Sequence, residues 1–419
     1  MLFSATNVVR SINLLIDYQC PQCGAPATLE ETDRLFECGF CRVKSYLVQR
    51  GYFRYLLPNK APAGKELVYF PYWRFKGMTF ACIPSGIKNR YVDLSYQAIN
   101  SQFFPASVGL RSQTLKLKFV TPETEGLFLK PALQLDKVMK IVEDRFKATL
   151  PKPILHQSYI GDTLSMLYAP FYVDNKIHDA VLNKPVSPSL PEEFDLDVFG
   201  GGRPDWGMDF LPTLCPACGW DLEGERDALV LNCKNCSTAW RPHKKKLEKL
   251  SVAYLPGEGE NLIYLPFWRI KAETSGLQLD SYADLIRVAN LPKVVQEGMH
   301  TERFHFWGLA FKVRPQNYLR LASSITLSQP PEELISEFPN ERALQVNLPL
   351  KEAVETLKLN LASFMKPRQT LNERLPEITI TPKSYLLVYL PFNEGYHEYL
   401  LPKLNLAINK NQLALAKNL

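Results

Sequence analysis

The sequence lacks the patterns that mark membrane-spanning and secreted proteins. No apolar run approaches the roughly 18–20 residues that a membrane-spanning helix needs. The first 20 residues lack the basic segment and the small-residue cleavage site of a secretory signal peptide. We therefore expect a cytoplasmic protein with no transmembrane segment, an expectation that leaves room for peripheral contact with a membrane surface.

The motifs of several common enzyme classes are missing as well. Histidine accounts for only 6 of 419 residues, and His300 and His305 do not form the paired signature of a zinc protease. The glycines at 200–202 are not followed by the Lys-Ser/Thr of a phosphate-binding loop, and Gly-x-Ser-x-Gly does not occur. These absences favour a non-catalytic protein without a small-molecule substrate. The enzyme question stays open, because catalytic groups need only converge in space.

Composition is that of an ordinary soluble globular chain. Apolar residues make up 46% of the sequence and charged residues 22%, which is enough apolar material to build a hydrophobic core. A chain of 419 residues exceeds what one core usually organises, so two or more domains are expected.

Eight of the nine cysteines fall into four Cys-x-x-Cys pairs. The first four recur 195 residues later with the same spacing; the two sets are Cys20, Cys23, Cys38, Cys41 and Cys215, Cys218, Cys233, Cys236. In an intracellular chain such pairs predict metal binding rather than disulfides. The ninth cysteine, Cys82, is expected to be a small buried hydrophobic residue.

The segments CPQCG at 20–24 and CPACG at 215–219 resemble the knuckles of four-cysteine zinc ribbons. The resemblance covers about residues 14–48 and 209–242, and the rest of the chain resembles no family that we recognise. It implies that two β-hairpins hold one Zn²⁺ in each copy. Four thiolates leave no position for water, so both sites would be structural. Iron in a rubredoxin-like carrier is the alternative, disfavoured because the second knuckles lack Pro and the following Gly.

The formal net charge of +6 suggests affinity for nucleic acid. Four thiolates around one Zn²⁺ carry a net charge of about −2, so two such sites would lower the total to about +2. The charge is therefore weak evidence for a nucleic-acid partner.

Aromatic strands centred on a proline also occur twice in each half. VYFPYWRFK at 68–76 matches IYLPFWRIK at 263–271, and LYAPF at 167–171 matches VYLPF at 388–392. Since proline cannot donate to a β-ladder, we expect it at strand edges or bulges. Between these strands we predict an Arg-x-Gln strand in each half (110–123 and 313–332) and helices at 132–150, 331–338 and 350–366.

These patterns predict a β-rich α+β fold that is internally duplicated. Each half would consist of a four-cysteine zinc ribbon and a barrel-like or sandwich-like domain with packing helices. The predicted units are ribbon 1 at 1–50, a β-rich domain at 51–190, a linker at 191–208, ribbon 2 at 209–245 and a second β-rich domain at 246–419.

Two further groups of residues are candidate binding sites. Trp73 with Arg74, and Trp268 with Arg269, are expected in the core, but at a surface they could grip a protein partner. The segment 241–250 carries a basic group that could hold phosphates or form a solvated surface; its members are Arg241, His243, Lys244, Lys245 and Lys246.

The function that these observations favour is a non-catalytic scaffold or adaptor that docks protein partners in a larger cytosolic or membrane-peripheral complex. The alternative is a nucleic-acid-binding protein that uses the ribbons and the basic segment 241–250.

Overall fold

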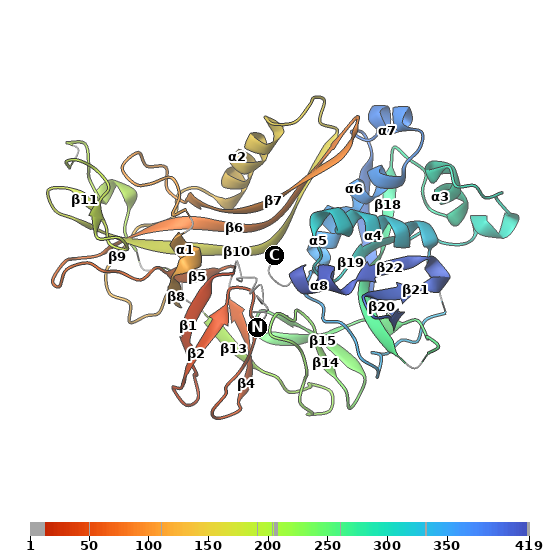
Figure 1. Cartoon of the computed structure of the whole chain (residues 1–419), viewed down its shortest axis with the longest axis horizontal. Coiled ribbons are helices and arrows are strands. Elements are labelled where there is room, and N and C mark those ends of the chain that lie inside the picture. The colour runs from red at the N-terminus through yellow and green to blue at the C-terminus, as the bar shows by residue number, and fades with distance from the viewer. Residues whose placement is uncertain are drawn as a thin grey trace, which may run out of the picture.

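A computed structural model describes residues 13–49, 51–109, 111–190, 192–202, 204, 208–259, 261–331 and 333–416. The fold is mixed α+β and rich in strands (Figure 1). The first sheet has ten strands and curls into a half-barrel. Its strands are β1 (Leu15–Gln19), β2 (Pro26–Glu30), β5 (Phe53–Leu56), β6 (Val68–Ile83), β7 (Gly86–Gln97), β8 (Lys116–Phe119), β9 (Leu127–Phe128), β10 (His156–Val173), β11 (Ile177–Asp179) and β12 (Lys184–Pro185).

Three smaller sheets follow. One combines β3 (Leu35–Glu37) and β4 (Lys44–Gln49) with β13 (Met208–Pro212), and another consists of β14 (Leu231–Cys233), β15 (Thr238–His243) and β16 (Lys246–Leu250). The last has six strands: β17 (Val252–Tyr254), β18 (Leu262–Ser275), β19 (Phe306–Leu309), β20 (Thr379–Glu394), β21 (Glu398–Leu401) and β22 (Leu406–Asn409).

The helices lie mainly in the C-terminal half. The N-terminal half has α1 (Arg111–Thr114) and α2 (Leu135–Lys147). The C-terminal half has α3 (Tyr282–Ala289), α4 (Pro315–Ser328), α5 (Leu350–Glu355), α6 (Leu357–Phe364), α7 (Arg368–Arg374) and α8 (Lys410–Ala416). Short 3₁₀ turns occur at Asp197–Phe199, Glu297–His300 and Pro402–Leu404.

The four proline-centred strands are central strands, not edges. Pro71 lies between the part of β6 that pairs with β9 and the part that pairs with β7. Pro170 lies between the segments of β10 that pair with β5 and with β11. Pro266 and Pro391 have equivalent places in β18 and β20. Each proline therefore sits where its strand changes partner on one side, and there the missing N–H costs no ladder hydrogen bond.

The proline-centred strands pair with each other in matching registers. In the first sheet β6 runs antiparallel to β10, with Pro71 opposite Tyr168. In the last sheet β18 runs antiparallel to β20, with Pro266 opposite Tyr389. A short strand joins the second member of each pair in parallel, β5 on β10 and β17 on β20.

Two of the predicted secondary-structure assignments are wrong, and a third is wrong in part. The Arg-x-Gln motif of the strand predicted over 110–123 lies on helix α1, and only Lys116–Phe119 in the described part of that range is a strand. The predicted strand over 313–332 is helix α4, which has Pro315 at its first position and buries Tyr318, Leu321 and Ile325 at helical spacing. The predicted helix at 331–338 is not helical where the structure describes it: Ile335 forms an isolated bridge with Tyr254, and their backbones exchange hydrogen bonds of 2.9 Å. The other two helix predictions correspond to α2 and to the pair α5 and α6.

The two halves share part of one hydrophobic core. The largest buried cluster fills the C-terminal half, but it also contains Met78, Phe80 and Cys82 of β6 and Ile160 of β10. Figure 1 shows the long strands of the first sheet reaching the helices of the C-terminal half. The described part of the predicted linker also packs on the N-terminal half, where the Phe199 ring lies 6.1 Å from that of Phe104.

Candidate metal centres

Each group of four cysteines is formed by two tight turns. In the first turn Gly24 and Gly219 adopt φ values of 72° and 74°, and each donates its N–H to the carbonyl of the first cysteine at 2.8 Å. A side chain would resist that conformation, which explains the glycine after the second cysteine. In the second turn the left-handed residues are Arg42 and Ser237.

The sulfur atoms of each group converge on one point. All four lie within 4.8 Å of one another in both groups. The Cys20–Cys41 and Cys23–Cys38 Sγ distances are both 3.7 Å. A zinc ion bound tetrahedrally at about 2.3 Å requires S–S distances of about 3.8 Å. The first group therefore has the size of a zinc site with four cysteine ligands.

The second group is slightly tighter. Its Cys215–Cys236 and Cys218–Cys233 Sγ distances are 3.6 and 3.4 Å. In each ribbon the four cysteines predicted as ligands therefore come together, and they form one cluster that is compatible with Zn²⁺.

At each centre, backbone hydrogen bonds favour the thiolate form of at least one cysteine. The N–H groups of Cys41 and Phe40 lower the pKa of Cys38 to about 6. Burial by itself would raise the pKa of Cys215, but hydrogen bonds from the Ala217 and Cys218 backbone lower it to about 6. The backbone of Val43 by itself would lower the pKa of Cys41, but burial and the neighbouring sulfur atoms raise it to about 12, and burial raises the pKa of Cys233 to about 12. Because metals bind the thiolate, at least one cysteine of each cluster is prepared for a cation, and metal binding must displace the proton of another.

The two ribbon segments lie side by side and are joined through backbone pairing (Figure 1). Strand β13, which leads into the second cysteine group, pairs antiparallel with β4, which leaves the first group. Pro212, three residues before Cys215, lies opposite Ser45, four residues after Cys41. Both centres are therefore at the same end of the joined sheets. The Tyr46 hydroxyl also donates to the carbonyl of Ala228 at 3.0 Å.

Large apolar side chains at the cysteine turns are exposed. Phe40 lies between Cys38 and Cys41 and is 73% exposed, and Trp220 directly after the Cys215–Gly219 turn is 59% exposed. Leu214, just before that turn, is 51% exposed. We call these three residues the knuckle face. Sequence reasoning missed them; the available signal was an apolar residue inside or beside a metal-binding turn, where no core can cover it.

The four candidate partner residues of the proline-centred strands are mostly buried. Trp73 and Trp268 are 5% and 3% exposed, and Arg74 is 1% exposed, whereas Arg269 is half-buried. The Trp73 indole donates to the carbonyl of Leu133 at 2.9 Å, just before α2. The Trp268 indole donates to the carbonyl of Leu348 at 3.1 Å, just before α5. Each buried indole therefore holds the backbone segment that leads into a helix.

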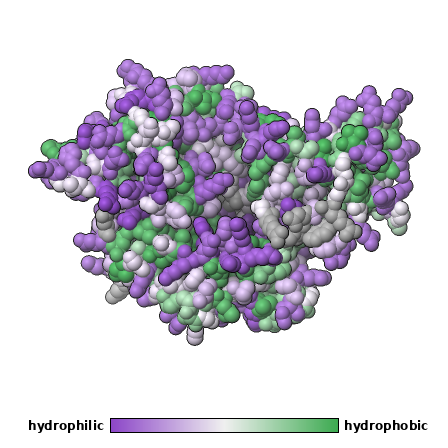
Figure 2. All heavy atoms as spheres, turned by 180° about the vertical axis from the view of Figure 1, so that it is seen from behind, coloured by the Kyte–Doolittle hydropathy of each residue, from purple (hydrophilic) through white to green (hydrophobic). Residues whose placement is uncertain are grey.

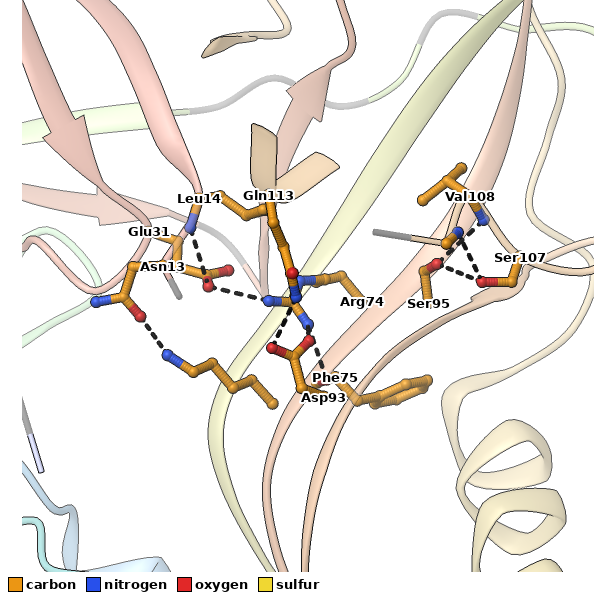
Figure 3. A network of polar contacts seen from close by, with 12 residues as sticks. Asn13, Leu14, Glu31, Arg74, Phe75, Asp93, Ser95, Ser107, Val108 and Gln113 are labelled. Atoms are coloured by element: carbon orange, nitrogen blue, oxygen red, sulfur yellow. Dashed lines mark hydrogen bonds and ion pairs between the residues drawn. The ribbon is translucent and has the colours of Figure 1, made fainter. Parts of the chain in front are cut away.

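Arg74 is the centre of a buried polar network (Figure 3). Its guanidinium lies between the carboxylates of Glu31 and Asp93 and is 3.2 Å from that of Glu31. The side-chain amide of Gln113 donates to the Asp93 carboxylate at 3.0 Å. Burial by itself would lower the pKa of Arg74, but the charges of Glu31 and Asp93 raise it above its ordinary value. Buried Lys76 donates to Asn13 in the same network. The network ties the first ribbon segment to the half-barrel.

The basic segment 241–250 forms the β15–β16 hairpin. Arg241 pairs with Glu248 at 2.9 Å across the hairpin, and Lys245 at its tip pairs with Asp209 at 2.8 Å. The remaining candidates are His243, Lys244 and Lys246, which are exposed. The hairpin extends away from the cysteine turns, so this cationic group and the knuckle face are at opposite ends of the second ribbon.

Hydrophilic side chains cover much of the face opposite to that of Figure 1, with separate hydrophobic areas between them (Figure 2). Among the described residues, no helix is both long enough and apolar enough to cross a bilayer. Comparison of the chain with protein-family models, curated proteins and solved structures found no match.

Proposed function

We propose that the chain arose by internal duplication. The matched registers of β6–β10 and β18–β20 support this, as do β-bulges whose extra residues, Asp162 and Lys383, follow the same 221-residue offset as Tyr168 and Tyr389. The carbonyls of Pro71 and Pro266 also accept equivalent hydrogen bonds, from the N–H of Ala98 at 2.9 Å and of Ala310 at 3.2 Å. Matching offsets of this kind are expected if one half was copied from the other.

We propose that both cysteine clusters hold structural Zn²⁺. Four thiolates complete a tetrahedral shell, so the ion would stabilise the turns without offering an open position to a substrate. Metal analysis of the purified protein should give two zinc ions per chain and no visible absorption. Iron at these sites, with the red colour of an iron–thiolate centre, would contradict the assignment.

We propose that the protein is a non-catalytic scaffold that docks protein partners through the knuckle face. The observation that carries this proposal is the exposure of Phe40 and Trp220 on the turns of the two cysteine clusters, which a bound metal would hold rigid. Large aromatic side chains on a rigid support lose little conformational entropy on binding and dominate interface energetics. Two such turns at one end of the joined sheets would let a single partner contact both.

The test compares three tagged proteins in lysates of the host, each with and without nuclease treatment. Wild type, a Phe40→Ala/Trp220→Ala variant and a Val294→Ala/Tyr396→Ala variant are each used to capture partners, which are quantified by mass spectrometry. Val294 and Tyr396 are 86% and 90% exposed and lie far from the cysteine turns in the sequence, which makes them a matched control. We expect the knuckle variant alone to lose captured proteins about tenfold or more.

Metal content and thermal stability should be the same in all three proteins, which separates docking from folding. Equal capture by the knuckle variant and by wild type would reject the knuckle face as the docking surface. Partners that disappear on nuclease treatment would favour the nucleic-acid function instead.

A further inference from the structure

The tip of the β6–β7 hairpin meets the helices of the C-terminal half (Figure 1). A cleft lies at this junction. Its walls are the hairpin tip, one face of α4, the end of α6 and the start of α7, and its volume is about 460 Å³. We call it the junction cleft. Its size falls within the range of small-molecule sites, which often form between structural units.

The charged side chains that line the junction cleft in the described part of the chain are all cationic. Arg320, Lys366 and Arg368 line it, and no described aspartate or glutamate does. The guanidinium of Arg368 is oriented by a 2.7 Å hydrogen bond to the carbonyl of Ser85 at the hairpin tip. All three side chains are exposed, and Arg320 also donates to the carbonyl of Ala407 at 3.5 Å. Their charges favour an anion over a cation at this place.

Neutral donors and an apolar wall complete the lining. Asn89, Gln316, Ser323 and Ser324 can donate hydrogen bonds from both sides of the cleft. The apolar lining includes the half-buried Ile87, two prolines (Pro84 and Pro315) and several largely buried side chains: Ile83, Leu319, Met365 and Leu371. A ligand that fits this lining has an acidic group for the cations and an apolar body for the wall.

We propose that the junction cleft binds a small organic anion in which a phosphate or a carboxylate is attached to an apolar body. Such a ligand would touch both halves of the chain, because the hairpin belongs to the N-terminal half and α4, α6 and α7 to the C-terminal half. This site is independent of the knuckle face and of the two metal centres.

Calorimetric titration of the full-length, metal-loaded protein tests the proposal with three probes that share one apolar body. These are 1-naphthyl phosphate, 1-naphthoate and the neutral 1-naphthalenemethanol. We expect the better anion to bind at least tenfold more tightly than the neutral probe, and the order of the two anions identifies the acidic group. A Lys366→Gln/Arg368→Gln variant should lose this difference.

A control variant, Arg303→Gln/Lys403→Gln, removes two exposed cations outside the cleft and should bind as wild type does. Ser323→Trp should abolish binding by filling the cleft, even if the charge variant is poorly folded. Equal binding of the neutral and anionic probes, unchanged binding in the Ser323→Trp protein, or no binding of any probe would each overturn the proposal.

Discussion

Arg74 and Arg269 follow matching tryptophans, but their surroundings differ. Arg74 is enclosed by Glu31 and Asp93, whereas Arg269 is half-buried beside β19. The residue 195 positions after Glu31 is Arg226, so the second half has no carboxylate at the equivalent place. The same strand position therefore carries a fully buried arginine in one half and a half-buried arginine in the other.

Replacement of Arg74 by methionine should destabilise the protein by about 3–5 kcal/mol, because it leaves two carboxylates buried without their cation. Arg269→Met is the matched control and should cost less than half as much. Urea unfolding of both variants in the presence of zinc measures the difference. Similar costs for the two substitutions would mean that the network contributes little to stability.

At the scale of elements, the sequence predicts most where local chemistry decides the outcome. Cysteine spacing located both metal clusters, and the apolar runs located the buried strands. The prediction failed where the structure depends on strands that lie far apart in the sequence. Pro71 is expected at an edge or a bulge, but it lies in a central strand at the point where β6 changes its neighbour from β9 to β7. The pairing of β13 with β4 likewise has no local signal, because residues 208–212 read as the start of a separate ribbon.

That pairing predicts coupling between the two metal centres. A Cys23→Ser variant should lose the first metal, loosen β4 and thereby weaken the support of β13 at the entrance to the second centre. The wild-type protein should release its two metals to a chelator in a faster and a slower phase. We expect the metal that remains in the variant to pass to the chelator about fivefold faster than the metal of the slower wild-type phase. The rate is followed with a coloured zinc indicator, and Cys218→Ser tests the reverse direction. An unchanged rate would show that the centres are independent.

At the scale of the whole molecule, the boundary in sequence is not the boundary in packing. Phe80 belongs to the N-terminal half, yet its ring lies 6.4 Å from that of Tyr318 on α4. The backbone N–H of Gly161 on β10 also donates to the Glu352 carboxylate on α5 at 2.8 Å. The end of the half-barrel thus acts as part of the C-terminal core, so the halves should not unfold independently.

Truncation of Phe80 to alanine should therefore destabilise the C-terminal half, although Phe80 belongs to the N-terminal half in sequence. We expect a loss of about 3–5 kcal/mol from the cavity and the lost apolar contact. Hydrogen exchange followed by mass spectrometry should show faster exchange in α4 and α6. Phe70→Ala is the matched control, since Phe70 packs 4.4 Å from Phe104 in the N-terminal core and its loss should leave α4 and α6 protected. Unchanged protection of α4 and α6 in the Phe80→Ala protein would instead make the junction a simple contact between two independent domains.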